Sequence, residues 1–382
     1  MNFSFTPGQE LIRSHVIAFA QKELNAGIIE RDRLQQFPKE LWLKCGEQKY
    51  QGLAIPEDAG GAGLDPFSTA IAFEALGYAS EDKGLNFSIA AHFSASVIPL
   101  WKHGTAAQKE MYLESMCGGK KIAVNAMTES ESGSDVFKIK TKAEKTANGY
   151  VLNGVKTFCT NGTVADIVIV YAVTDEPKGF HGGISAFILD KNTPGIRVGQ
   201  EFEKMGLRSS PLCELIFENV IAKEENVLGG IGGGTSIFNH SMEWERIMMS
   251  ALHAGTMENI LEKCIHYAQS RHAGNEPIGK KQAVAHRIAT MRMQLEASKM
   301  LLYKAAEGLE NNRENALNAS IAKVYVSEAF TECAKEAIGI FGGNGYMTEY
   351  GIERILRDAV GSTIYSGTSD IHRNIISRWL GL

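Results

Sequence analysis

The stretch Ile364-Tyr365-Ser366-Gly367-Thr368-Ser369-Asp370-Ile371-His372-Arg373 is the one around which we interpret the rest of the chain. Its first residues contain a glycine and are typical of a loop, whereas the later ones are typical of a short terminal helix. Thr368 or Ser369 is suited to cap that helix, and Asp370 suits its positive end. A helix start of this kind offers free N–H groups to a phosphate or a polar ring. Taken alone, however, the stretch is more simply explained as an ordinary capped helix.

Length and composition are those of a globular enzyme. The 382 residues are enough for two or three domains. A formal net charge of −5 gives no broad basic field, so nucleic acid is not an expected partner. No run of about 18 apolar residues occurs, which argues against a membrane span, and the N-terminus lacks the features of a signal peptide. The six cysteines include no Cys-x-x-Cys pair, and the ten histidines show no metal-ligand spacing. We therefore expect reduced thiols, a cytoplasmic location and no metal site.

The periodicity of apolar residues changes twice along the chain, which predicts three domains and an α+β fold class. Residues 1–122 favour helices, including one over about 85–102, and residues 231–382 favour long helices over about 235–270, 279–310 and 314–340. Between them, residues 123–230 contain short β-branched segments separated by turns, with a strong hairpin signal at Asn148-Gly149. The expected strands are 138–145, 150–152, 165–173, 184–189 and 213–217.

Three further motifs carry a family resemblance. They are Met-Thr-Glu-Ser-Glu-Ser-Gly-Ser-Asp at 127–135, Gly-Val-Lys-Thr-Phe-Cys-Thr-Asn-Gly at 154–162 and Met-Gly-Leu-Arg-Ser-Ser at 205–210. Singly, the first is compatible with a surface loop and the second with a core strand. Together with Tyr-Ser-Gly-Thr at 365–368 they resemble the acyl-CoA dehydrogenase family over essentially the full length. The resemblance implies an N-terminal helical domain, a middle β-barrel-like domain and a C-terminal four-helix bundle.

The catalytic base has to be sought outside the loop, because Ser366 stands where many members of the family carry a catalytic glutamate. Phe238, Met242, Glu245, Met249 and Leu252 recur on one face of a predicted helix. A carboxylate in an apolar stripe is costly to ionise, so its pKa should rise towards the range of a general base. A partly buried glutamate paired with an arginine or lysine is the alternative.

The resemblance decides between these readings of the helix. Isovaleryl- and long-chain-type members carry their base on this helix directly before an arginine, as in Glu245-Arg246. Glu245 is therefore the expected catalytic base, with Glu243 on a different face. The Ser366 backbone N–H would still polarise the thioester carbonyl, whatever its side chain.

The resemblance also implies the remaining site residues. Phe158 would pack beside the flavin ring, and Thr160 would bond near its reactive nitrogen. Segments 271–282 and 342–345 would reach the FAD of a neighbouring subunit, which implies a homodimer or homotetramer; Gly274 and Asn275 depart from the family pattern there. A Gly-rich turn such as 342–345 is, alone, more often a helix C-cap. The expected FAD contacts are Met127, Thr128, Gly133, Ser134, Phe158, Thr160, Arg271, Gln282, Gly339, Gly342, Gly343, Thr368 and Asp370. The expected substrate contacts are Ser134, Arg246, Tyr365 and Gly367.

The implied activity is FAD-dependent α,β-dehydrogenation of an acyl or aminoacyl thioester, with an electron-transfer flavoprotein or oxygen as the electron acceptor. The regions around Trp244 and Pro277 look most like the branch that oxidises groups tethered to carrier proteins, such as prolyl-carrier protein, in polyketide and nonribosomal peptide pathways. Dehydrogenation of a free acyl-CoA in catabolism is the alternative. A non-catalytic flavin-binding homologue and a flavin monooxygenase on the same fold are further alternatives, against which the position of Glu245 in an apolar stripe argues.

Overall fold

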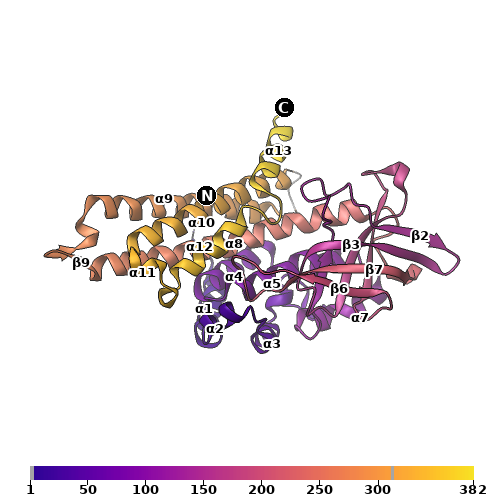
Figure 1. The fold of residues 1–382 in the computed structure, drawn as a ribbon, viewed down its shortest axis with the longest axis horizontal. Helices are drawn as coiled ribbons and strands as arrows, with labels where there is room; N and C mark the ends of the chain where they lie inside the picture. Colours follow the sequence, from indigo (N-terminus) through magenta and orange to yellow (C-terminus); the bar gives the residue numbers. More distant parts are fainter. Residues whose placement is uncertain (1–3, 311–313) are drawn as a thin grey trace.

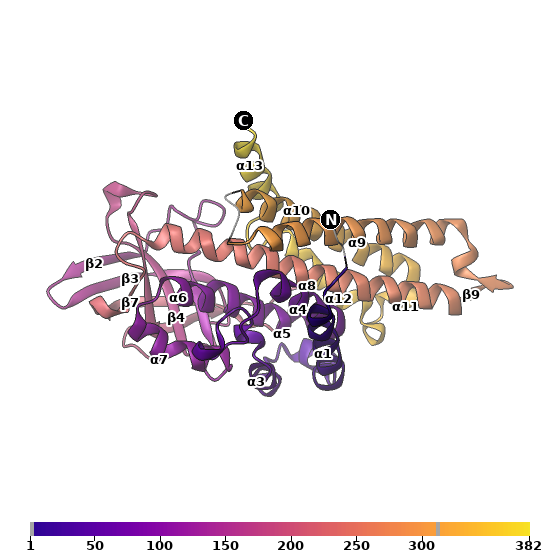
Figure 2. The same cartoon turned by 180° about the vertical axis from the view of Figure 1, so that it is seen from behind.

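The computed structural model describes residues 4–310 and 314–382; the first three residues of the N-terminus, in which no signal peptide is expected, lie outside them. Figures 1 and 2 show an elongated molecule. The large sheet lies at one end, and a bundle of long helices extends to the other (Figure 1). Helix α8 runs through the whole length and connects the two ends, while α13 projects from the body.

The N-terminal part is helical. Several of its helices begin at side-chain caps: Thr6, Asp65 and Thr105 each accept a hydrogen bond from a backbone N–H of the first turn. The helices are α1 (Pro7–Glu23), α2 (Ile28–Leu34), α3 (Lys39–Glu47), α4 (Pro66–Ala79), α5 (Lys83–His92), α6 (Ile98–His103) and α7 (Ala106–Cys117).

The middle part is one eight-stranded sheet with the order β6-β7-β3-β2-β4-β5-β8, in which β1 pairs in parallel with β4. The predicted hairpin is confirmed: β2 and β3 pair in antiparallel fashion, with Thr146 opposite Gly149. The strands are β1 (Ala123–Ala126), β2 (Lys142–Thr146), β3 (Gly149–Thr160), β4 (Ile167–Val173), β5 (Ile184–Asp190), β6 (Ile196–Glu201), β7 (Leu212–Ala222) and β8 (Val227–Leu228).

Long helices return after the sheet. A small hairpin of β9 (His272–Ala273) and β10 (Glu276–Pro277) joins α8 to α9 at the far end of the bundle (Figure 1). The helices are α8 (Gly234–Ser270), α9 (Gln282–Gly308), α10 (Asn315–Phe341), α11 (Gly343–Tyr346), α12 (Ile352–Ser362) and α13 (Ser369–Trp379). The described residues include no helix long and apolar enough to cross a membrane.

The single helix expected over 85–102 was wrong, because a π-helical turn at Phe93–Val97 separates α5 from α6. Pro99 follows this turn and has no N–H, so the carbonyl of Ala95 loses its usual helical donor. Asn125 on β1 supplies a replacement, since its Nδ2 donates to the Ala95 oxygen at 2.9 Å. The break therefore follows from one proline and joins the helical part to the sheet.

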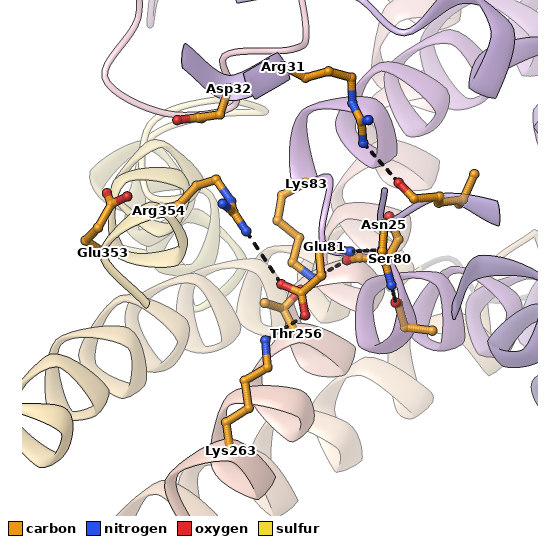
Figure 3. A network of polar contacts seen from close by, with 12 residues as sticks. Asn25, Arg31, Asp32, Ser80, Glu81, Lys83, Thr256, Lys263, Glu353 and Arg354 are labelled. Carbon is orange, nitrogen blue, oxygen red and sulfur yellow. Dashed lines mark hydrogen bonds and ion pairs between the residues drawn. The ribbon is translucent and has the colours of Figure 1, made fainter. Parts of the chain in front are cut away.

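A polar network joins the N-terminal helices to the C-terminal bundle (Figure 3). Glu81, in the turn before α5, accepts from Lys263 of α8 at 2.6 Å and lies 3.7 Å from the guanidinium of Arg354 on α12. Burial acts to raise the pKa of Glu81, but Lys263, Lys83 and Arg354 together lower it. Its backbone N–H donates to the Asn25 side chain at 2.7 Å. These contacts fix α5 and α12 on the side of α8 where the candidate site lies.

Candidate active site

Glu245 lies in the first third of α8 and is only 9% exposed. The Ser366 hydroxyl, from the loop between α12 and α13, donates a hydrogen bond to its Oε1. Burial raises the pKa of Glu245, while the Ser366 hydrogen bond, Arg246 and Lys323 act in the opposite direction. The expected base and the loop position at which relatives carry glutamate are therefore in direct contact.

Glu243 differs from Glu245 by its partners and not by the direction of its pKa. It is half-buried, and burial raises its pKa too, against the effect of His240 and Arg246. The apolar stripe was an incomplete description, because α8 is buried on several faces around this point, with Trp244 and Ile247 as buried as Met249. What distinguishes Glu245 is its contact with the loop.

The loop that carries Ser366 has an unusual backbone. Ser366 has φ +56° and Gly367 has φ +96°, values at which glycine is at ease and serine is held under strain. The Ser366 and Gly367 N–H groups have no acceptor among the described residues. Thr368 caps α13 as predicted, since its Oγ1 accepts from the Ile371 N–H at 3.2 Å. The loop thus presents unused N–H donors next to the Glu245 carboxylate.

Tyr365 closes the site on the inner side. Its hydroxyl is 2.7 Å from Nε2 of His253, which lies about two helical turns beyond Glu245 on α8. Its ring centroid is 4.6 Å from that of Phe87 on α5. Burial lowers the pKa of His253 to about 3, so this imidazole is neutral at physiological pH. Behind Tyr365 remains a cavity of about 20 Å³, bordered also by Met249. A space of this size holds about one water molecule.

The two predicted flavin motifs lie side by side on the sheet. The Thr157 N–H donates to the Thr128 carbonyl at 2.8 Å, which joins β3 to the end of β1. Phe158 lies at an irregularity in the pairing of β3 with β7, has φ +53° and is 60% exposed. Thr160 ends the same strand. An aromatic ring held out of a sheet by strained backbone is a ready platform for a flat ligand.

A buried ion pair holds these motifs together. Lys156 donates to Glu129 at 2.7 Å and to the Met127 carbonyl at 2.9 Å. Glu129 also accepts from the backbone N–H groups of Lys140 and Thr141. Burial lowers the pKa of Lys156 to about 8. Sequence reasoning missed this role, although both residues belong to the quoted motifs.

The remaining residues of this side fit an isoalloxazine ring and its ribityl chain. Met127 is buried under the strand end and Thr128 is half-exposed, while Gly133 and Ser134 are exposed. A side chain at Gly133 would meet nothing within 4 Å, so a ligand could approach its backbone. These donors, together with the Phe158 ring, provide the flat, polar-edged surface that a flavin needs. The described residues contain no cluster of three or more His, Cys, Asp or Glu able to hold a metal ion.

Another set of expected flavin contacts lies far from Glu245. Arg271 ends α8, 26 residues beyond Glu245, which corresponds to about 39 Å of helix. Gln282 begins α9, and Gly342 and Gly343 follow α10 at the same end of the bundle as the β9 hairpin (Figure 1). Gly339 lies in the last turn of α10. One chain therefore does not bring Arg271, Gln282 or these glycines together with Phe158, and their contact with a neighbour's FAD stays a prediction. Asp370 differs, because it lies in the first turn of α13, four residues after Ser366, and so beside the loop that contacts Glu245.

The comparisons with known proteins cover all three parts of the chain. Residues 6–120, 125–220 and 232–381 match the sequence patterns described as the N-terminal, middle and C-terminal domains of acyl-CoA dehydrogenase. The chain belongs to the acyl-CoA dehydrogenase family.

Among its relatives is the L-prolyl-[peptidyl-carrier protein] dehydrogenase of Pseudomonas fluorescens, 39% identical over 100% of both chains. The mitochondrial isovaleryl-CoA dehydrogenase of Oryza sativa is 38% identical over 98% of this chain and 92% of the relative. The crystal structure of the prolyl acyl carrier protein oxidase AnaB superposes with a TM-score of 0.97 at 43% identity, covering 99% of this chain and 100% of the other.

Proposed function

We propose that this protein is an FAD-dependent dehydrogenase of a prolyl or related aminoacyl thioester tethered to a carrier protein. The observation that carries the proposal is the contact between the buried Glu245 carboxylate and the loop of Ser366, beside free N–H groups. A base next to a donor for the thioester oxygen is the arrangement that α-proton abstraction requires.

The roles of the residues follow from this arrangement. The Ser366 N–H binds the thioester carbonyl oxygen, which makes the neighbouring Cα–H more acidic. Glu245 takes the α-proton, and burial supports this role because it raises the pKa of the carboxyl towards neutrality. FAD supplies the acceptor for the hydride that leaves Cβ, so that a Cα–Cβ double bond forms and one proton and one hydride are removed. Phe158, Thr128 and Thr160 would hold the flavin.

The floor of the site favours a short acyl group. Tyr365 contacts both Phe87 and His253, which lies two turns beyond Glu245 on α8, and the cavity beside them holds about one water molecule. A five-membered ring fits in front of such a floor, whereas an eight-carbon chain would have to displace it. The similarity of the whole chain to a prolyl-carrier protein dehydrogenase (39% identical) and a prolyl acyl carrier protein oxidase (43% identical) also supports a short acyl group.

Dehydrogenation of a free short-chain acyl-CoA is the second candidate, supported by the identity to isovaleryl-CoA dehydrogenases. Both candidates use Glu245 in the same role and differ in the group that carries the thioester. The electrons would pass on to an electron-transfer flavoprotein or to oxygen.

Anaerobic reduction of the bound flavin tests the proposal. The FAD-loaded protein is mixed with L-prolyl-carrier protein, isovaleryl-CoA or octanoyl-CoA, and the flavin absorbance is followed. We expect fastest bleaching with the prolyl-carrier protein and none with octanoyl-CoA. Faster bleaching with isovaleryl-CoA would favour the free thioester, and no bleaching with any of them would reject the dehydrogenase.

A further inference from the structure

The two carbonyl groups of the Ser366–Gly367 loop are both bound by side chains from other elements. Lys323, from the middle of α10, donates its Nζ to the Gly367 oxygen at 2.6 Å. His372, in the first turn of α13, places Nε2 at 3.0 Å from the Ser366 oxygen, and Arg246 places Nε at 3.5 Å from the same atom. The loop is therefore held through its carbonyls, while its N–H groups are left unused.

Lys323 and His372 are buried more deeply than such side chains usually are. Lys323 is 2% exposed and His372 is not exposed at all. A buried lysine or histidine costs free energy unless its donors are used, and the Gly367 oxygen is the one acceptor that the described residues offer to the Lys323 ammonium. Burial lowers the pKa of His372 to about 3, so the ring is neutral and must carry its proton on Nε2 to donate to Ser366.

We propose that Lys323 and His372 are positioning residues that hold the strained loop so that the Ser366 N–H faces the substrate carbonyl. The inference rests on the proposed function and adds two residues to it. The positive φ of Ser366 makes the loop conformation unfavourable on its own. Donors fixed on three different helices compensate for that strain, and they orient a group that itself binds the reacting atoms.

The charge of Lys323 adds a second effect. Burial and Arg246 lower its pKa to about 7, while Glu245 and Glu328 act in the opposite direction. The charge of Lys323 also helps to lower the pKa of His372 and of His253, and both rings are neutral. When Glu245 takes the α-proton it loses its negative charge, so the cations of Lys323 and Arg246 are then free of its attraction and favour the negative charge that develops on the thioester. The charged lysine thus favours abstraction of the α-proton in addition to orienting the Ser366 loop.

The main experiment compares Lys323→Met with wild type in anaerobic flavin reduction between pH 6 and 9. The variant keeps the length of the side chain but removes its donor and charge. We expect the reduction rate constant to fall about 10- to 100-fold at pH 6, the loss seen for residues that orient metal ligands from behind, with a change in substrate KM of less than about twofold. Because wild-type Lys323 loses its proton as the pH rises through about 7, the ratio of the two rates should shrink towards pH 9.

Lys204→Met is the matched control. Lys204 is also a buried lysine whose pKa burial lowers to about 8, and it donates to the carbonyls of Leu207 and Ser210, away from the loop. We expect its pH profile to follow that of wild type. A pH-dependent loss equal to that of Lys323→Met would overturn the inference, because it would show a general effect of removing buried lysines.

His372 supplies a second pair of variants and a readout that does not need activity. His372→Gln retains an N–H that can reach Ser366, whereas His372→Leu does not, so glutamine should restore most of the rate that leucine loses. Hydrogen exchange of the 364–368 amides, measured without substrate, should be faster in Lys323→Met and His372→Leu than in wild type. Unchanged exchange in both variants would reject the positioning role of Lys323 and His372, whether or not the wild type is active. Inactivity of the wild type with every thioester would reject only the proposed function.

Discussion

Glu245 is the single residue on which the proposed chemistry depends. Glu245→Gln keeps the shape of the side chain and its hydrogen bond with Ser366 but removes the base. We expect unchanged flavin content and a fall of about 10²–10⁴-fold in the rate of anaerobic flavin reduction, the usual contribution of a positioned base. Glu243→Gln should cost much less, because the neighbours that act on Glu243 among the described residues are His240, Arg246, Asn315 and Glu310, none of which belongs to the loop. Stopped-flow absorbance measures both, and full activity of Glu245→Gln would end the assignment.

The hydroxyl of Ser366 should tune the pH dependence of that base. Its hydrogen bond lowers the pKa of Glu245, so Ser366→Ala should raise this pKa further. Glu245 must be ionised to accept a proton, and the acidic limb of kcat/KM should therefore shift to higher pH. The backbone N–H remains in the variant, so the rate at high pH should approach that of wild type. Ser362→Ala, which removes a hydroxyl bonded to the Ser327 carbonyl on α10, is the control; an unshifted limb in Ser366→Ala would contradict the prediction.

At the scale of helices and strands, local signals predicted the elements that depend on local residues. The α13 cap at Thr368, the β2–β3 hairpin and the long helix α8 follow from side chains close in sequence. Strand β1 was not predicted, because its four residues pair in parallel with β4, more than 40 residues away. The strand expected at 150–152 is longer in the structure, where it forms β3. Its pairing with β7 is irregular just after Leu152 and again at Phe158, and these irregularities interrupt the alternation from which its length would be predicted.

The site residues that belong to a sequence motif were predictable, whereas the contacts between elements distant in sequence were not. Glu245 and Ser366 were both identified from sequence, but the hydrogen bond between them depends on packing across 121 residues. Lys323 and His372 were missed for the same reason. A lysine within a helical pattern and a histidine near a helix start are ordinary surface residues unless the fold buries them. The neighbouring sequence does not predict that burial.

The contact between β1 and β3 depends on the buried pair of Lys156 and Glu129. Lys156→Met removes one partner and leaves a buried carboxylate uncompensated, which should destabilise the protein by about 3 kcal/mol. Lys142→Met removes the exposed pair with Glu176 and should cost less than about 1 kcal/mol. Urea unfolding followed by circular dichroism gives both values. Equal stability of the two variants would show that the pair does not hold the strands together.

At the scale of the whole molecule, α8 separates the two sets of expected flavin contacts. It carries Glu245 beside the sheet and ends at Arg271, about 39 Å away. At that far end Tyr346 is 76% exposed, next to the open glycines Gly342 and Gly343, at which added side chains would meet nothing within 4 Å. An exposed aromatic residue beside open backbone is suited to a contact with another subunit.

This arrangement predicts that the FAD-loaded protein is a dimer or a tetramer in which one subunit's bundle end completes the flavin site of another. Size-exclusion chromatography with light scattering gives the mass. Arg271→Ala should weaken FAD binding, because its guanidinium is expected on the pyrophosphate, while the mass and the Glu245 site stay unchanged. Arg292→Ala, which removes an exposed arginine paired with Glu296 on α9, should bind FAD as wild type does. A monomer fully loaded with flavin would rule out the cross-subunit contact, because within one chain Arg271 lies too far from Phe158 to touch the same cofactor's ring.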